Sequence, residues 1–149
     1  MKDLMALDAT DQARLVRDGE VTATELVTAA IDAIETRDGD INAVTYRRFE
    51  RALEEAAQID PEAPFAGVPT LTKSLDDLAC APANYGSAWV ARSGRTAKTD
   101  SPLVARLRRS GHIILGQSAS PEFGLAATTE TTDHGITRTP WDRDRTSGG

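Results

Sequence analysis

The chain has 149 residues, of which 40% are hydrophobic and 27% charged, and its formal net charge is −6 at pH 7. This length fits one globular domain with a real core, and the negative charge argues against a nucleic-acid partner. One cysteine, Cys80, and two histidines leave no internal disulfide and no metal-ligand spacing, so we expect no bound metal.

The first ten residues lack a basic segment followed by a long apolar run, which a signal peptide would require. No apolar run approaches the length that spans a membrane. A single cysteine also fits a reducing compartment. We therefore expect a soluble, cytoplasmic protein with no membrane partner.

The first part of the chain is rich in alanine, glutamate, arginine and leucine, which favour helices. Residues 10–18 are predicted to form a short helix that ends at Gly19, a suitable C-cap. A second helix is predicted to begin at Thr22, because Thr22 and Glu25 form a capping-box pattern. Its apolar residues share one helical face and are Leu26, Val27, Ala30, Ile31 and Ile34.

The remainder of the chain alternates between strand and helix patterns. Short apolar segments predict strands at residues 42–45, 67–72 and 112–115. Helices are predicted at residues 47–58, from Asp100-Ser101-Pro102 to Gly111, and from Ser120-Pro121-Glu122. A long loop is expected between Ser74 and Thr99. This order is typical of a sheet covered by helices, so the predicted fold class is α/β, with no linker that would separate two domains.

Lys73 is the first residue that could carry chemistry. It ends an apolar strand, and a lysine that is partly desolvated there would have a lowered pKa and could act as a general base. The alternative is an ordinary surface lysine that ends a strand, and spacing alone favours that alternative.

Three other candidates are better explained by structure than by catalysis. Residues 116–120 are similar to a nucleophile elbow, but the last glycine is missing, so Ser118 is not expected to be a nucleophile and Ser120 is expected to cap a helix. Cys80 has no assignable base and is expected to be a small packing residue. His134 lies in a turn-like context and is expected to serve a turn or packing role.

Taken together, several segments resemble the amidase signature family in order and spacing. They are residues 65–73, 100–108, 111–116 and 121–123, and then Gly135 with 139–141 and 145–149. The helical first third is also similar to that family, though less specifically. The resemblance implies a hydrolase that cleaves the C–N bond of a small-molecule carboxylic amide without a cofactor. It leaves open a homodimer in the full-length enzyme.

The family's catalytic machinery is a lysine, a serine in a cis peptide bond and a nucleophilic serine. By motif, Lys73 is the lysine of this Ser-cisSer-Lys triad. The resemblance places the bridging serine just past Gly149 and the nucleophile further downstream. The chain is therefore expected to be an incomplete amidase signature domain over residues 1–149, with a helical region at 1–60 and the start of a mixed-sheet α/β core at 65–149.

The resemblance also implies a substrate-binding segment. Its residues, which correspond to the acyl pocket of the family, are Phe123, Gly124, Leu125 and Ala126. Residues 128–130 are similar to members that cleave aminohexanoate amides, but this likeness is too short to name a substrate.

Two positions depart from the family pattern. The family often has aspartate where this chain has Ser74, and lysine where it has Gln117. The first departure bears on how Lys73 is oriented, and the second changes a local ion pair.

Two other interpretations stay open at this point. The chain could be a short binding module in which Lys73 is dispensable, or a fragment that is inactive until a separate C-terminal piece supplies the serines. An incomplete sheet predicts an unpaired edge, exposed apolar surface and self-association. The 149-residue chain alone is expected to be inactive as an amidase, because a lone lysine cannot form an acyl-enzyme.

Overall fold

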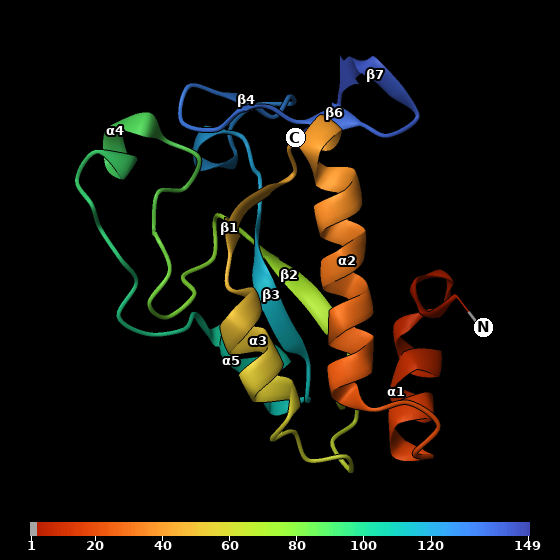
Figure 1. Cartoon of the computed structure of the whole chain (residues 1–149). Helices are drawn as coiled ribbons and strands as arrows, with labels where there is room; N and C mark the ends of the chain where they lie inside the picture. The colour runs from red at the N-terminus through yellow and green to blue at the C-terminus, as the bar shows by residue number, and fades with distance from the viewer. Residues whose placement is uncertain (1–2) are drawn as a thin grey trace. The chain divides into compact units, whose positions relative to one another are not determined.

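The structure is a computed structural model that describes residues 3–149 (Figure 1). The chain divides into two compact units, each assembled from three separate stretches. The first unit is Met1–Thr36, Arg48–Leu71 and Ala105–Leu115, and the second is Arg37–Arg47, Thr72–Val104 and Gly116–Gly149.

Helices and strands alternate along most of the chain, and this mixture confirms the predicted α/β class. In order they are η1 (Leu4–Ala6), α1 (Ala9–Arg17), α2 (Ala23–Ile41), β1 (Val44–Arg47), α3 (Phe49–Ala56), β2 (Pro69–Lys73), α4 (Ala88–Ala91), α5 (Pro102–Arg109), β3 (Ile113–Ser118), η2 (Glu122–Gly124), β4 (Glu130–Thr131), β5 (Gly135–Ile136), β6 (Arg138–Thr139) and β7 (Asp142–Thr146).

The capping box predicted for α2 is confirmed. The Thr22 hydroxyl accepts a hydrogen bond from the Glu25 N–H at 3.1 Å, and the Glu25 carboxylate accepts one from the Thr22 N–H at 2.8 Å. These bonds to Thr22 lower the pKa of Glu25 below its ordinary value, because they favour the charged carboxylate. Helix α1 begins in a similar way, with the Asp8 carboxylate accepting from the Asp11 N–H at 2.9 Å.

The core of the first unit is apolar and confirms the predicted inner face of α2. Its buried members come from α1, α2, α3, the segment after α3 and β3, and are Val16, Ala23, Leu26, Val27, Ala30, Ile31, Ala52, Ala56, Ala66, Ile113 and Leu115. Gly67 allows the chain to approach this core closely. Its φ is +75°, and an added Cβ would lie 2.5 Å from the Ala23 side chain.

A buried ion-pair cluster joins α3, α5 and β3 within the first unit. The Arg48 side chain is only 4% exposed, and its guanidinium bonds the Glu55 carboxylate at 2.5 Å and donates to the Ile114 carbonyl. Arg108 donates to the same carboxylate at 3.0 Å. Burial alone would raise the pKa of Glu55, but the hydrogen bonds and charges of Arg48 and Arg108 outweigh it, and the net result is a lowered pKa.

The three-stranded sheet has the order β1-β3-β2, with β3 in the centre. Strand β1 runs antiparallel to β3, with a register shift between Val44 and Tyr46. Next to this shift, Arg47 of β1 pairs with Gly116 of β3. A Cβ on Gly116 would overlap with the Tyr46 carbonyl oxygen, so only glycine fits there.

Two small hairpins, β4-β5 and β6-β7, belong to the second unit. The Asn42 side-chain amide donates to the carbonyls of His134 and Ile136 at 2.8 and 3.2 Å. The Thr137 hydroxyl donates back to the Asn42 carbonyl at 2.8 Å. Asn42 itself has φ +56°, a left-handed conformation that asparagine tolerates better than most residues. Asn42 therefore anchors the segment that contains the β4-β5 hairpin. The sequence patterns did not predict this hairpin.

Several predicted boundaries are corrected by the structure. The expected loop between Ser74 and Thr99 contains the short helix α4. The expected helix after Ser120 is only the three-residue η2, and its N-cap residue is Pro121 with no side-chain cap bond. The prediction that Ser120 caps a helix is therefore wrong. The Ser120 hydroxyl has another buried partner instead, described below.

The predicted strand starts and helix ends also shift by a few residues. Strand β1 begins two residues later than expected, because the Asp38 carboxylate accepts from the N–H groups of Ala43 and Val44 at 2.7 and 3.2 Å. Helix α3 begins at Phe49 rather than Arg47, since Arg47 belongs to β1.

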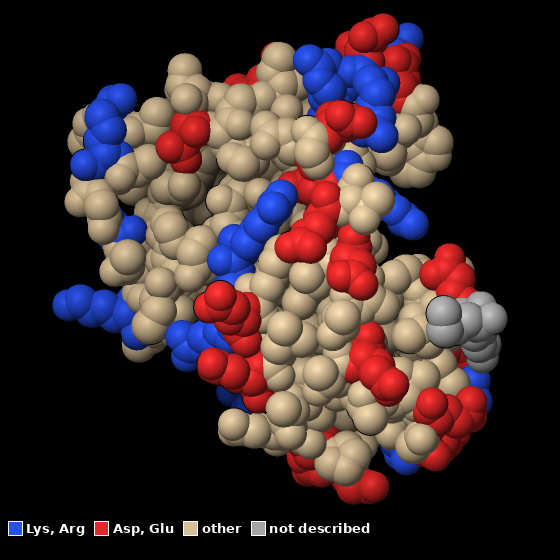
Figure 2. All heavy atoms as spheres, in the orientation of Figure 1, with Lys and Arg blue, Asp and Glu red and all other residues tan. Residues whose placement is uncertain are grey.

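The charged surface is mixed in sign. Figure 2 shows Asp and Glu side chains interspersed with Lys and Arg on the face that it draws. Of the helices in residues 3–149, none combines the length and the apolar character needed to cross a lipid bilayer.

Removing the Glu55 carboxylate should destabilise the chain strongly. Glu55→Gln leaves the buried Arg48 guanidinium without its counter-charge, which should lower the free energy of unfolding by about 3 kcal/mol in urea denaturation. The matched control Glu54→Gln changes an exposed neighbour on the same helix and should stay within about 0.5 kcal/mol. Equal effects of the two substitutions would show that the cluster contributes nothing.

His112 should make stability depend on pH near neutrality. Burial lowers the pKa of His112 below its ordinary value of 6.5, and its Nδ1 lies 2.8 Å from the Ser110 hydroxyl. The unfolded chain therefore binds a proton at a higher pH than the folded chain, so stability is full above pH 6.5 and falls as the pH drops below it. His112→Gln should flatten this slope in denaturation series at pH 5.5 to 7.5. An unchanged slope would contradict this assignment.

Candidate active site

Lys73 is the last residue of β2, at the point where the strand turns away from the sheet. Its carbonyl accepts a hydrogen bond from the Asp76 N–H at 2.9 Å, which closes a tight turn. The side chain is exposed, so among residues 3–149 the partial burial considered above is not observed. The structure thus places Lys73 at a strand end, as expected, with its side chain open to solvent.

The residue after the lysine is held by a buried hydroxyl pair. The Ser74 and Ser120 hydroxyls lie 2.5 Å apart, and each residue is 2% exposed. The Ser74 N–H also donates to the Ser118 carbonyl at 2.9 Å. Ser74 therefore fixes the end of β2 against the end of β3 and against the segment that leads into η2.

Gln117 holds the same turn from the other side. Its side chain is 2% exposed, and its amide donates to the Asp76 carbonyl at 2.9 Å. Both departures from the family pattern, Ser74 and Gln117, thus make neutral hydrogen bonds around the turn that follows Lys73. The expectation that Gln117 changes a local ion pair stays a prediction.

Asp77, which follows Asp76, forms a second polar cluster with Tyr85 and Arg95. The Tyr85 hydroxyl donates to the Asp77 carboxylate at 2.8 Å, and Arg95 donates to the Tyr85 oxygen at 2.7 Å. The Arg95 guanidinium also lies 5.3 Å from the centre of the Tyr85 ring, within cation–π range. Desolvation, together with the bond to Asp77, raises the pKa of Tyr85 above its ordinary value, so the phenol stays neutral.

The predicted substrate-binding residues lie in and after η2 of the second unit. Phe123 has φ +53°, and its N–H donates to the Tyr85 carbonyl at 2.9 Å. Its ring is 6.4 Å from that of Tyr85 and is 47% exposed. Gly124 has φ +70° and lies against Leu75. Leu125 is 86% exposed, and Ala126 is also exposed.

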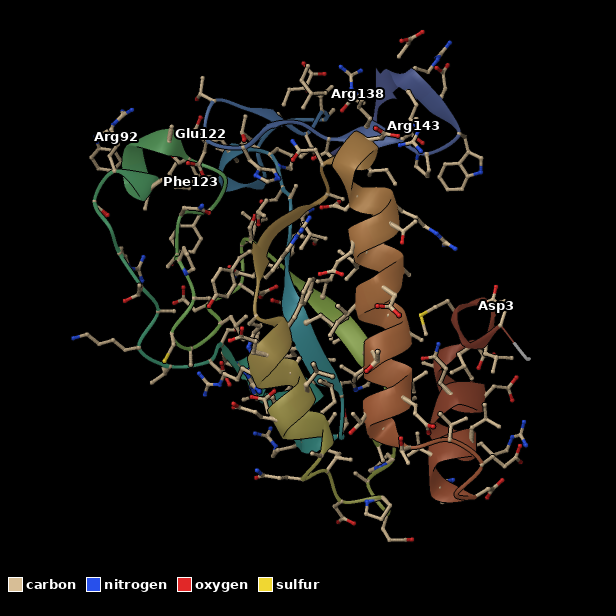
Figure 3. All side chains as sticks on the ribbon, in the orientation of Figure 1. Asp3, Arg92, Glu122, Phe123, Arg138 and Arg143 are labelled. Atoms are coloured by element: carbon tan, nitrogen blue, oxygen red, sulfur yellow. The ribbon has the colours of Figure 1, made fainter. Side chains whose placement is uncertain are left out.

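Phe123 and Arg92 both line a cavity of about 550 Å³. Figure 3 shows these two residues near α4. Other lining residues are Tyr85, Trp89 and Arg95. These residues were not selected from the sequence, because they belong to a segment expected to be an irregular loop. The signal that could have found them is the unusual density of aromatic and arginine residues between positions 85 and 95.

Gly148 and Gly149, the last two residues of the chain, lie beside the predicted substrate-binding residues. The Thr129 hydroxyl donates to the Gly148 carbonyl at 2.6 Å. A Cβ on Gly149 would overlap with the Ala126 carbonyl oxygen, so the backbones pass very close to each other. Residues 126–129 and 148–149 are therefore neighbours in the second unit.

The remaining candidates are Ser118, Cys80 and His134. Ser118 is a strand residue of β3 rather than the tip of an elbow, and its hydroxyl lies within 3.4 Å of the Thr72 carbonyl. Cys80 is exposed with φ +67°, so the expectation of a packing residue is wrong for its side chain. The His134 Nε2 is buried and has no hydrogen-bond partner. Over residues 3–149, no group of three potential metal ligands is found.

These features can now be compared with known proteins. Residues 25–149 match the family model described as Amidase. The chain belongs to the amidase signature family. It is 41% identical, over 95% of its length, to the 6-aminohexanoate-cyclic-dimer hydrolase of Paenarthrobacter ureafaciens, and 34% identical, over its whole length, to one component of the glutamyl-tRNA(Gln) amidotransferase of Mycolicibacterium gilvum.

Solved structures agree with this assignment. The structure of a 6-aminohexanoate cyclic dimer hydrolase matches the whole chain with a TM-score of 0.92 at 37% identity, and a bacterial aryl acylamidase of the amidase signature family matches 96% of it with 0.89 at 32%. A fatty acid amide hydrolase, at 18% identity and a TM-score of 0.90, shows the shared fold alone. The chain spans only about a third of the length of these relatives. It covers 29% of the cyclic-dimer hydrolase sequence and 31% of the amidotransferase component. It covers 30% of the chain in the cyclic dimer hydrolase structure and 31% of the chain in the aryl acylamidase structure.

The buried hydroxyl pair should show energetic coupling. Ser74→Ala leaves the buried Ser120 hydroxyl without a partner and should cost about 1–3 kcal/mol in the free energy of unfolding. Ser120→Ala should cost a similar amount. The double variant should cost less than the sum, by at least about 0.5 kcal/mol, because no orphaned hydroxyl remains.

The control for this cycle is Ser147→Ala, which changes an exposed serine of the same unit and should stay within about 0.5 kcal/mol. Strict additivity of Ser74→Ala and Ser120→Ala would contradict a direct bond between the two hydroxyls.

Proposed function

We propose that this chain supplies the lysine of a Ser-cisSer-Lys triad in an enzyme that hydrolyses a small-molecule carboxylic amide. The observation that carries the proposal is the position of Lys73. It ends β2, and Ser74 and Gln117 hold the turn that follows it through buried hydrogen bonds. Membership of the amidase signature family supports the same role.

In this proposal the bridging and nucleophilic serines come from a segment that is not among these 149 residues. Neutral Lys73 accepts a proton from the bridging serine, which accepts one from the nucleophilic serine. The nucleophile attacks the amide carbonyl, the amine leaves with a proton, and water then releases the acid from the acyl-enzyme. Lys73 can act in this way only if the ammonium form is disfavoured, which requires that other residues cover its exposed side chain.

The resemblance to relatives suggests the substrate class but not one compound. The relatives include proteins named for a cyclic aminohexanoate dimer and for aryl amides, so a small amide with an apolar part is the best supported class. Phe123, Gly124, Leu125 and Ala126 are proposed to contact its acyl side. This proposal is supported by the aromatic cavity that Phe123 lines.

A chimera tests the role of Lys73. Residues 1–149 would replace the matching N-terminal part of the 6-aminohexanoate-cyclic-dimer hydrolase of Paenarthrobacter ureafaciens, and release of amine from the cyclic dimer and from simple amides would be assayed. The chimera should be active, and Lys73→Met should lower kcat by about 10²- to 10⁴-fold, the usual contribution of a general base. The 149-residue chain alone should show no turnover.

The matched control is Lys98→Met, which removes another exposed lysine of the second unit and should leave kcat within about twofold. A folded chimera without activity, or one in which Lys73→Met keeps full activity, would refute the proposed role.

A further inference from the structure

The cavity beside α4 gathers aromatic side chains in a chain that has few of them. We call it the α4 cavity, and its lining includes Tyr85, Trp89, Val90, Arg92, Arg95 and Phe123. The whole chain has three Phe, two Trp and two Tyr residues. Three of these aromatic side chains line one cavity of about 550 Å³. Their concentration indicates that the cavity requires flat apolar surfaces.

The aromatic walls are open to solvent. Trp89 is 75% exposed and Phe123 is 47% exposed. Large apolar side chains that surround a hollow, rather than lying singly on a surface, are typical of places where a ligand is bound. Aromatic rings have few rotatable bonds, so they supply contact area at a small cost in conformational entropy.

The shape of the α4 cavity is fixed by backbone contacts. Tyr85 and Phe123 both have φ +53°, a conformation that non-glycine residues rarely adopt, and the Phe123 N–H donates to the Tyr85 carbonyl at 2.9 Å. Gly86 packs so closely that a Cβ would lie 2.7 Å from the Ser120 carbonyl oxygen. Strained backbone persists only where its surroundings impose it, so these contacts hold the backbones at Tyr85 and Phe123 in fixed positions relative to each other.

The charge of the lining opposes the charge of the chain. Two arginines line the cavity and, within the described part of the chain, no Asp or Glu does, although the chain has a net charge of −6. Arg95 is engaged by Tyr85 and lies 3.7 Å from the Asp77 carboxylate. Arg92, at the C-cap of α4, presents an exposed guanidinium, a group that binds carboxylates in a bidentate manner (Figure 3).

Building on the amide hydrolysis proposed above, we infer that the α4 cavity binds an apolar part of the amide substrate that carries a carboxylate. A ring or alkyl chain lies against Trp89 and Phe123, and the carboxylate pairs with Arg92. Such a site selects anionic amides, or the acids that their hydrolysis produces, over neutral amides of the same size.

Binding can be measured on the 149-residue chain itself, without turnover. Trp141→Phe leaves Trp89 as the only tryptophan, so its fluorescence reports on the cavity. The probes are 4-phenylbutyrate and its neutral analogue 4-phenylbutanamide, which differ in charge but hardly in size. We expect a saturable change with 4-phenylbutyrate at about millimolar concentration, as befits a ligand of this size, and weaker binding of the amide.

Substitutions separate the two contacts. Arg92→Gln should weaken 4-phenylbutyrate binding by at least about fivefold and leave the amide within about twofold, because only the acid uses the guanidinium. Phe123→Ala should weaken the binding of both probes. The control Arg143→Gln changes an exposed arginine of β7 and should change neither (Figure 3). Far-ultraviolet circular dichroism checks that each variant is folded.

Absence of a saturable signal with either probe, or an equal effect of Arg92→Gln on both probes, would overturn the inference. This measurement needs no catalysis. A negative binding result would therefore not refute the proposed role of Lys73, which the chimera assay tests separately. Conversely, loss of the Lys73 role in the chimera would not alter probe binding to the α4 cavity.

Discussion

The backbone groups of the buried strand β3 need hydrogen-bond partners within the protein, and the positions of the neighbouring elements depend on this constraint. Residues Ile113 to Gln117 are all buried, so each backbone group needs a protein partner. The Ile113 N–H donates to the Val68 carbonyl, and the Leu115 carbonyl accepts from the Arg48 N–H. The Ile114 carbonyl accepts from the Arg48 guanidinium, which explains why a charged side chain is buried at the start of α3. The partners of β3 therefore fix where β2 runs and where α3 begins.

The same strand also determines where the proposed chemistry is located. Its last residues provide the Ser118 carbonyl for the Ser74 N–H and the Gln117 amide for the Asp76 carbonyl. These bonds are neutral, so they orient the turn after Lys73 without adding a charge at positions 74 and 117. A charged partner at either position would change the electrostatic potential near the lysine as well as its geometry. Ser74 and Gln117 thus contribute to the geometry of this turn rather than to its charge.

Local patterns predicted well those features whose causes are local. The capping box of α2 and its apolar face depend on spacings within one helix, and both are confirmed. The hairpins were missed because a distant group anchors them, as when the Asn42 amide binds the carbonyl of His134. The start of β1 was missed because a side chain, the Asp38 carboxylate, binds the N–H groups of Ala43 and Val44. The role of Ser120 was misjudged for the same reason, since its partner, Ser74, is far away in sequence. The α4 cavity combines residues from two segments, and no periodic pattern could have joined them.

Gly116 has a consequence for how β1 and β3 find each other. Only a residue without a side chain fits against the Tyr46 carbonyl oxygen. If β1 slid by one residue along β3, Leu115 or Gln117 would meet a backbone that leaves no room for a Cβ. The misaligned pairing is thereby excluded by sterics, without help from the hydrophobic pattern. A glycine at position 116 therefore favours the alignment that pairs Arg47 with Gly116 over alignments that would set a side chain against this backbone.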